Sequence, residues 1–239
     1  MDGISIALGK YGVTAMSMTG SNADIDAAED FVVAGGNAPA PVAGGSAYLL
    51  EVISADANDD GSPAGTGAQT VVVEGIDASG DLQTATVTMN GITAVAIPTV
   101  TWTAVNRAYV ATAGSTLTNV GEITVRVASA GATKLTIPAA VGLSDGAFYL
   151  VPNGYTLLIL GAEFSVLTGG IVTVGIMIDG VVYHVNTVVT SLAHHDSFHV
   201  PIAVKAGEFV RARALAVSAA SQSARASLEC LLVADGVAF

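Results

Sequence analysis

The sequence predicts an all-β protein, an antiparallel β-sandwich or jelly roll made of two β modules that follow an extended N-terminal arm. Short runs rich in β-branched residues recur at regular spacing with turn residues between them, which is typical of such folds. Asp179-Gly180 separates the apolar runs 176–178 and 181–185, and Asn90-Gly91 separates 82–89 from 92–98. A type I′ turn needs positive φ at both central residues, so Asx-Gly between apolar runs predicts a hairpin at each place.

We expect residues 1–46 to form an extended N-terminal arm or linker. Gly, Ala, Ser, Asn and Pro interrupt its short apolar pieces, most densely in the stretch AGGNAPAPVAGGS at 34–46. Two interpretations stay open. The segment is either a terminus without fixed structure or an arm that docks on a neighbouring subunit.

The remaining chain divides into a β-sandwich module at 47–138 and a jelly-roll-like module at 139–239, although one fused sandwich is the alternative. The first module contains the expected strands 48–54, 69–76, 82–89, 92–98, 106–112, 121–128 and 133–138. The second contains the expected strands 147–151, 155–166, 171–178, 181–189, 197–204, 208–217 and 226–234. Seven or eight strands in about a hundred residues is the content of a jelly roll.

The composition disfavours several classes of partner. Charged residues make up 12% of the chain, against roughly 25% in a typical soluble domain, so its surface is covered by small polar residues or by partner subunits. The formal net charge of −12 would repel phosphate backbones, and we therefore expect no nucleic-acid partner. The longest apolar stretches are interrupted well before the about 20 residues of a spanning helix, so we expect no membrane association. Cys230 alternates with Leu228 and Leu232, which predicts a buried thiol.

The loop DANDDG at 56–61 resembles the first half of a calcium-binding loop. Asp56, Asn58 and Asp60 stand at alternate positions before Gly61, so three oxygen ligands can converge where glycine takes the sharp turn. The twelfth position, which supplies a bidentate glutamate in that motif, is Gly67 here. The candidate metal is calcium, and the alternative is an Asx-rich turn without an ion. No other cofactor is expected.

All four histidines lie between 184 and 199. His184, His194, His195 and His199 flank Asp196, and imidazole is a common ligand of zinc or nickel. Strand alternation sends His194 and His195 to opposite faces, which weakens a metal site. The alternative is a loop or interface location whose charge responds to pH.

The sequence GLSDG at 142–146 matches the hydrolase nucleophile pattern, with Ser144 at its centre. That pattern works only on a strand-turn-helix elbow, and here the chain continues into the expected strand 147–151. We therefore expect a surface turn and a protein that is not an enzyme. An esterase or metal-dependent hydrolase that uses Ser144 or the histidines is the alternative.

Arg211 and Arg213 share one face of the expected strand 208–217. Two guanidinium groups on one strand are suited to pair with carboxylates of a neighbouring subunit, so both are candidate interface residues. The alternative is cross-strand pairing inside the sheet, for instance with Glu229.

Residues 71–125 carry an ordered set of motifs. A strand is followed by a G-x-D-x-x-G turn at 75–80, T-x-T-V-T at 84–88, Asn90-Gly91 and V-N-R-A-Y-V at 105–110. This order resembles a segment of virion structural proteins of tailed bacteriophages, especially marine ones. The stretches 133–142, 148–166 and 201–214 are similar to the same group. The resemblance implies a virion component and assigns no catalytic residue.

These observations lead to the hypothesis of a non-enzymatic bacteriophage virion structural protein. Its leading form is a capsid decoration or cement protein that stabilises the head exterior through homo-oligomeric contacts, for example as a trimer. The expected partners are further copies of the chain and the major capsid protein or other virion proteins, in particles assembled in the host cytoplasm. The alternative is a tail component: a tube, adaptor, collar or fibre and receptor-binding module.

Overall fold

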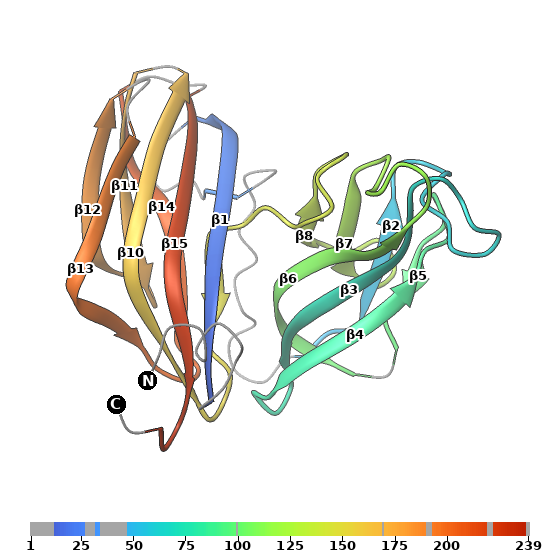
Figure 1. Ribbon diagram of the computed structural model, residues 1–239, viewed down its shortest axis with the longest axis horizontal. Helices are drawn as coiled ribbons and strands as arrows, with labels where there is room; N and C mark the ends of the chain where they lie inside the picture. Colours follow the sequence, from blue (N-terminus) through green and yellow to red (C-terminus); the bar gives the residue numbers. More distant parts are fainter. Residues whose placement is uncertain are drawn as a thin grey trace. The chain divides into compact units, whose positions relative to one another are not determined.

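The computed structural model describes residues 12–26, 32–33, 47–98, 100–168, 170–189, 193–218 and 222–237. Every regular element in these ranges is a β-strand, and every strand pair is antiparallel, which confirms the predicted fold class (Figure 1). Within the same ranges, no helix is long and apolar enough to cross a membrane. The chain forms two compact units: residues 1–36 with 146–239, called unit 1 here, and residues 37–145, called unit 2.

Unit 1 is a jelly roll of two four-stranded sheets, with the strand orders β1-β15-β10-β13 and β12-β11-β14-β9. Its strands pair in a nested manner, since β1 pairs with β15, β9 with β14, β10 with β13 and β11 with β12. The strands are β1 Val13–Ile25, β9 Phe148–Leu150, β10 Tyr155–Thr168, β11 Ile171–Ile178, β12 Val181–Val189, β13 Ala193–Val204, β14 Phe209–Val217 and β15 Gln222–Ala234.

Strand β1 lies inside the segment that we expected to be an arm, and this part of the expectation is wrong. β1 pairs with β15 from Val13 opposite Val233 to Ile25 opposite Gln222. Its small residues allow the backbone of a neighbouring segment to approach closely. A Cβ on Gly20 would lie 2.1 Å from the carbonyl oxygen of Val32. The expected stretch 34–46 lies outside the described residues. The unit boundaries at 36/37 and 145/146 also differ from the expected 46/47 and 138/139.

The core of unit 1 fills the space between the two sheets. Alternate residues of β15 point into it, among them Leu228, Cys230 and Leu232, and they share the core with Phe164 of the neighbouring strand β10 and with Ile176 of β11 in the other sheet. The buried thiol expected at Cys230 is confirmed, and burial, together with the neighbouring Glu229 carboxylate, raises its pKa to about 12.

The hairpin at Asp179-Gly180 is confirmed. Asp179 has φ +47° and Gly180 has φ +85°, the combination that a type I′ turn needs, and Ile178 pairs with Val181 across it. The Asp179 side chain adds a non-local contact, since its Oδ1 accepts a hydrogen bond from the Phe209 backbone N–H at 3.0 Å. The turn thereby holds the β11–β12 hairpin to the start of β14.

Unit 2 consists of two antiparallel sheets with the orders β5-β2-β7-β8 and β4-β3-β6. The prediction of a hairpin at Asn90-Gly91 is wrong, because β4 pairs with β3 while β5 pairs with β2 in the other sheet. Gly91 has φ +54°, but its turn carries the chain between sheets. The strands are β2 Leu50–Ser54, β3 Ala68–Asp77, β4 Leu82–Thr88, β5 Val95–Ala96, β6 Trp102–Ala113, β7 Ile123–Val127 and β8 Thr133–Ile137.

A fully buried carboxylate, Asp59, joins three separate segments of unit 2. Its Oδ2 accepts hydrogen bonds from the Ser54 hydroxyl at 2.6 Å and the Gly121 N–H at 2.9 Å. Its Oδ1 accepts from the Ala68 N–H at 2.7 Å and the Val120 N–H at 2.8 Å. Four donors satisfy a charge that burial alone would make costly.

We predict that Asp59→Asn lowers the free energy of unfolding of unit 2 by about 1–3 kcal/mol, because the new amide N–H₂ would face backbone donors. Trp102 is the single tryptophan and is fully buried in unit 2, so denaturant unfolding followed by its fluorescence reports the change. Asp56→Asn is the control, since one oxygen, Oδ1, accepts both of its hydrogen bonds from Asn58. Equal stability of the two variants would contradict the role given to Asp59.

Candidate functional site

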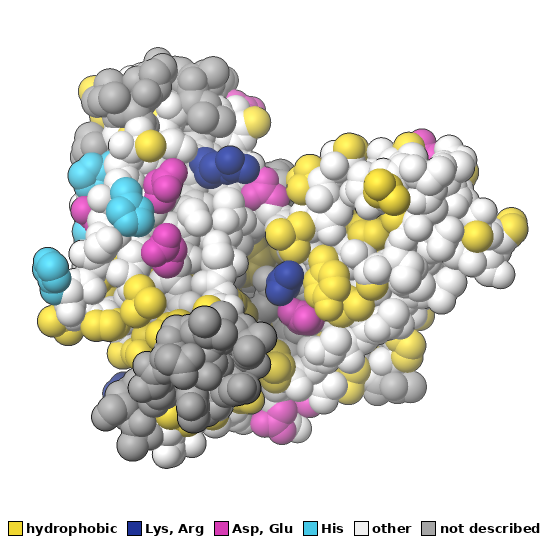
Figure 2. Space-filling model, viewed as in Figure 1, with side chains coloured by type: hydrophobic (Ala, Val, Ile, Leu, Met, Phe, Trp, Pro, Cys, Tyr) yellow, Lys and Arg dark blue, Asp and Glu magenta, His cyan; other side chains and the backbone are white. Residues whose placement is uncertain are grey.

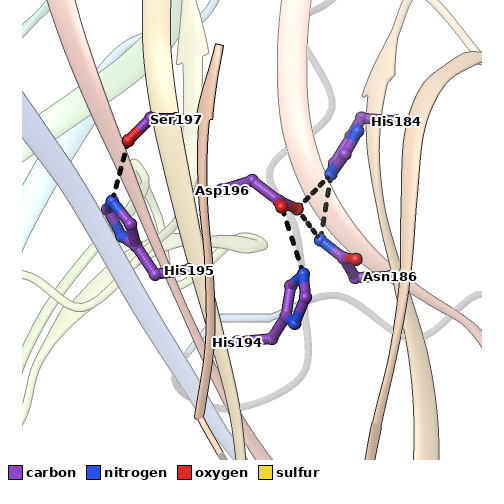
Figure 3. Close-up of polar contacts among 6 residues, drawn as sticks. All are labelled: His184, Asn186, His194, His195, Asp196 and Ser197. Carbon is purple, nitrogen blue, oxygen red and sulfur yellow. Dashed lines mark hydrogen bonds and ion pairs between the residues drawn. The ribbon is translucent and has the colours of Figure 1, made fainter.

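A cluster of polar side chains joins the edge strands of the two sheets in unit 1. Asp196 on β13 has its Oδ2 2.8 Å from Nε2 of His184 on β12, and its Oδ1 3.1 Å from Nε2 of His194 (Figure 3). The side-chain amide of Asn186 donates to the same Oδ2 and lies 2.9 Å from the His184 Nε2. One carboxylate therefore connects β12 in one sheet with β13 in the other.

The surroundings of Asp196 favour its charged form. The hydrogen bond from Asn186 is the main reason that the pKa of Asp196 lies below its usual range, and His184 and His194 contribute further. Partial desolvation opposes this shift, and the side chain keeps 28% of its surface exposed. The carboxylate is consequently ionised at neutral pH and can accept hydrogen bonds from either protonation state of the two imidazoles.

The predicted separation of His194 and His195 is confirmed. The Nε2 of His195 lies 3.2 Å from the Ser197 hydroxyl, away from Asp196 (Figure 3). The His184 ring packs edge-on against Phe198, with 4.9 Å between ring centroids. Among the residues that the structure describes, no three His, Cys, Asp or Glu side chains are grouped to hold a metal ion. The arrangement observed is a hydrogen-bonded tie between strands.

Apolar side chains are exposed beside this cluster. On β12, Val181, Val182, Tyr183 and Val185 keep between 41% and 58% of their surface exposed. Figure 2 shows the histidines at the left edge of the view, where Figure 1 places β12 and β13. This edge of unit 1 therefore combines the hydrogen-bonded cluster around Asp196 with exposed apolar side chains of β12.

The candidate calcium loop forms Asx turns. Oδ1 of Asp56 accepts from the Asn58 backbone N–H at 2.8 Å, and Oδ1 of Asp60 accepts from the Ser62 N–H at 2.8 Å. Sequence reasoning selected these residues and Asn58 but missed Asp59, the carboxylate that organises the loop from inside. Calcium binding stays a prediction, and metal analysis of dialysed protein tests it.

Ser144 lies against the backbone of β6. Its hydroxyl accepts a hydrogen bond from the Ala108 N–H at 3.1 Å, and its own N–H donates to the Ala108 carbonyl at 2.8 Å. The chain then continues into β9, as expected. The serine therefore does not lie on the strand-turn-helix elbow that would activate it.

Arg211 and Arg213 share the half-exposed face of β14, while Ala212 between them is buried, so the predicted alternation is confirmed. The Arg211 guanidinium lies 5.6 Å from the centroid of the Phe209 ring. Cross-strand pairing with Glu229 is excluded by the sheet topology, because Glu229 is on β15 in the other sheet, opposite Ser17 and Gly161.

No protein-family model matches the chain, and no curated protein matches its sequence. Structural comparison finds the VP2 subviral particle of infectious bursal disease virus, with 11% identity over 93% of this chain and 72% of that one, at a TM-score of 0.22. The T=1 particle derived from the same virus matches at 13% identity over 95% of this chain and 71% of that one, also at a TM-score of 0.22. Both scores are too low to define a shared fold or function.

We predict that Asp196 stabilises unit 1 at neutral pH and not in acid. A carboxylate whose folded-state pKa is lowered contributes stability above its ordinary pKa of about 3.9, and this contribution disappears as the pH falls through the folded-state value. Asp196→Asn should therefore be less stable than the wild type at pH 7, by up to about 1 kcal/mol for a part-exposed group, with the difference shrinking as the pH falls through the folded-state pKa of Asp196.

Denaturant unfolding followed by circular dichroism between pH 7 and pH 2.5 measures this difference. Asp235→Asn, which removes an exposed carboxylate of the same unit, is the control and should show little change at any pH. A stability difference for Asp196→Asn that stays constant over the whole pH range would contradict the prediction.

Proposed function

We propose that this protein is a non-enzymatic structural component of a bacteriophage virion, in the form of a decoration or cement protein on the outside of the head. The observation that carries the proposal is the exposure of neighbouring apolar side chains along one strand of a jelly-roll unit. Adjoining exposed apolar side chains are a feature of surfaces that pack against other proteins. Jelly rolls are also common in viral capsid proteins.

The fold alone does not assign this role, because jelly rolls serve many functions. The resemblance of residues 71–125 to virion structural proteins supports a role in the virion. The net charge of −12 supports a location on the exterior of the head, away from packaged DNA. Adhesion to the capsid requires only the burial of apolar surface, which stabilises a contact by about 25 cal/mol for each Å² removed from water. The partners proposed are further copies of this chain and the major capsid protein.

The environment of the candidate catalytic residues supports a non-enzymatic role. The Ser144 hydroxyl is bonded to backbone, and the His184 and His194 rings are bonded to Asp196. Ser144 thus contributes to a contact with β6, and His184 to the link between β12 and β13. A tail component is the alternative location, since the same kind of surface would serve there.

We expect this protein to be present in purified phage particles at a copy number comparable with that of the major capsid protein. Quantitative mass spectrometry measures that ratio, with a known minor tail protein of the same particles as the reference. A copy number close to that of the tail reference would replace the head location by the tail alternative. Absence from the particles would refute the virion role.

A further inference from the structure

We infer that β12 is the edge through which this chain associates with a second copy of itself, with the two β12 strands paired antiparallel. The inference rests on the proposed structural role and names the surface that such a role would use. It is carried by three properties of β12: its free edge, its lack of charge and its exposed apolar side chains.

Strand β12 ends its sheet. In the described part of the chain its ladder partner is β11, so alternate N–H and C=O groups along its other side point away from the sheet. Such an edge accepts a further extended strand unless the sequence prevents it. The one register shift between β12 and β11 lies near the hairpin, at Tyr183, and the pairing is regular from His184 to Val189.

Residues 181–189, VVYHVNTVV, include no Asp, Glu, Lys or Arg. Val181, Tyr183 and Val185 are each about half exposed, at 58%, 56% and 49%. Natural edge strands are usually protected by charged side chains, proline, bulges or short length. β12 therefore lacks the charges and the proline that keep other edges apart.

The other edge strands of unit 1 have such protection. β13 contains Asp196 and Pro201. β1 carries the exposed Asp24, and β9 has only three residues. In unit 2, the uncharged edge strand β4 exposes mainly threonines. The contrast singles out β12 as the edge that is free to pair.

The chemistry of β12 favours a second copy as its occupant. Each copy carries a formal net charge of −12, so contacts between acidic parts of two copies are repulsive, whereas β12 itself contributes no Asp, Glu, Lys or Arg, and the nearby Asp196 carboxylate is hydrogen-bonded to His184 and Asn186. Antiparallel pairing about a two-fold axis is self-complementary. With His184 opposite its own equivalent, Tyr183 of each copy faces Val185 of the other, an aromatic and β-branched pair that stabilises sheets.

Sedimentation equilibrium of the full chain tests the inference. The wild type should associate in a concentration-dependent manner, and more strongly at high salt because salt screens the repulsion between copies. Val185→Lys should raise the dissociation constant at least about tenfold while circular dichroism shows an unchanged fold. Val200→Lys is the matched control, since it places the same charge on β13 at a side chain that is 82% exposed, and it should leave association unchanged.

Hydrogen exchange tests the same contact without a substitution. Dilution of the wild type below its dissociation constant should speed exchange at alternate amides of 181–189 and leave 193–204 unchanged. A wild type that stays monomeric at all concentrations, or equal weakening by Val185→Lys and Val200→Lys, would overturn the inference. If the protein is monomeric in solution but abundant on particles, the proposed function stands and the β12 contact is refuted. If it dimerises through β12 but is absent from particles, the contact stands and the proposed function is refuted.

Discussion

The fold of unit 1 depends on the antiparallel pairing of its first strand, β1, with its last, β15. This pairing joins Val13 to Val233, so it closes a loop that contains almost the whole chain, including all of unit 2. Loop-closure entropy grows only slowly with length, which is why such an insertion is tolerated. The other strand pairs nest inside this one. β15 is hydrogen-bonded to β10 on its other side, and its inward face supplies core residues that pack against the opposite sheet.

The nested pairing also decides which strands remain at the edges. β12 and β13 are consecutive in the chain but belong to different sheets, and each ends its own sheet. Asp196 spans the two through His184 and Asn186, so a polar tie takes the place of a backbone ladder at that point. Tyr183 and Val185 of β12 are exposed because they point to the outer face of the sheet, while His184 and Asn186 are half-buried on the other face, beside Asp196. The edge position of β12 thus arises from topology and not from any chemical motif.

Two aspartates show how burial assigns different roles to one residue type. Asp59 is fully buried and accepts four hydrogen bonds from fixed donors, so it joins segments of unit 2 permanently. Asp196 is part-exposed and is hydrogen-bonded to two histidines and an asparagine. Protonation of its carboxylate would weaken these bonds between β12 and β13. Asp59 thus joins segments within unit 2, whereas Asp196 links two edge strands at the surface of unit 1, where we expect its contribution to stability to depend on pH.

The sequence by itself determined the all-β class, most strands and the Asp179-Gly180 hairpin, because alternation and turn chemistry act between residues close in the chain. The same local reasoning failed at Asn90-Gly91, where β4 and β5 enter different sheets, and at β1, whose small residues suit close backbone packing but read as a linker. It chose Asp56, Asn58 and Asp60 and missed Asp59, since the donors that fix Asp59 come from up to 62 positions away. Only the tertiary structure decided these points, because each depends on contacts between segments whose proximity no local pattern records.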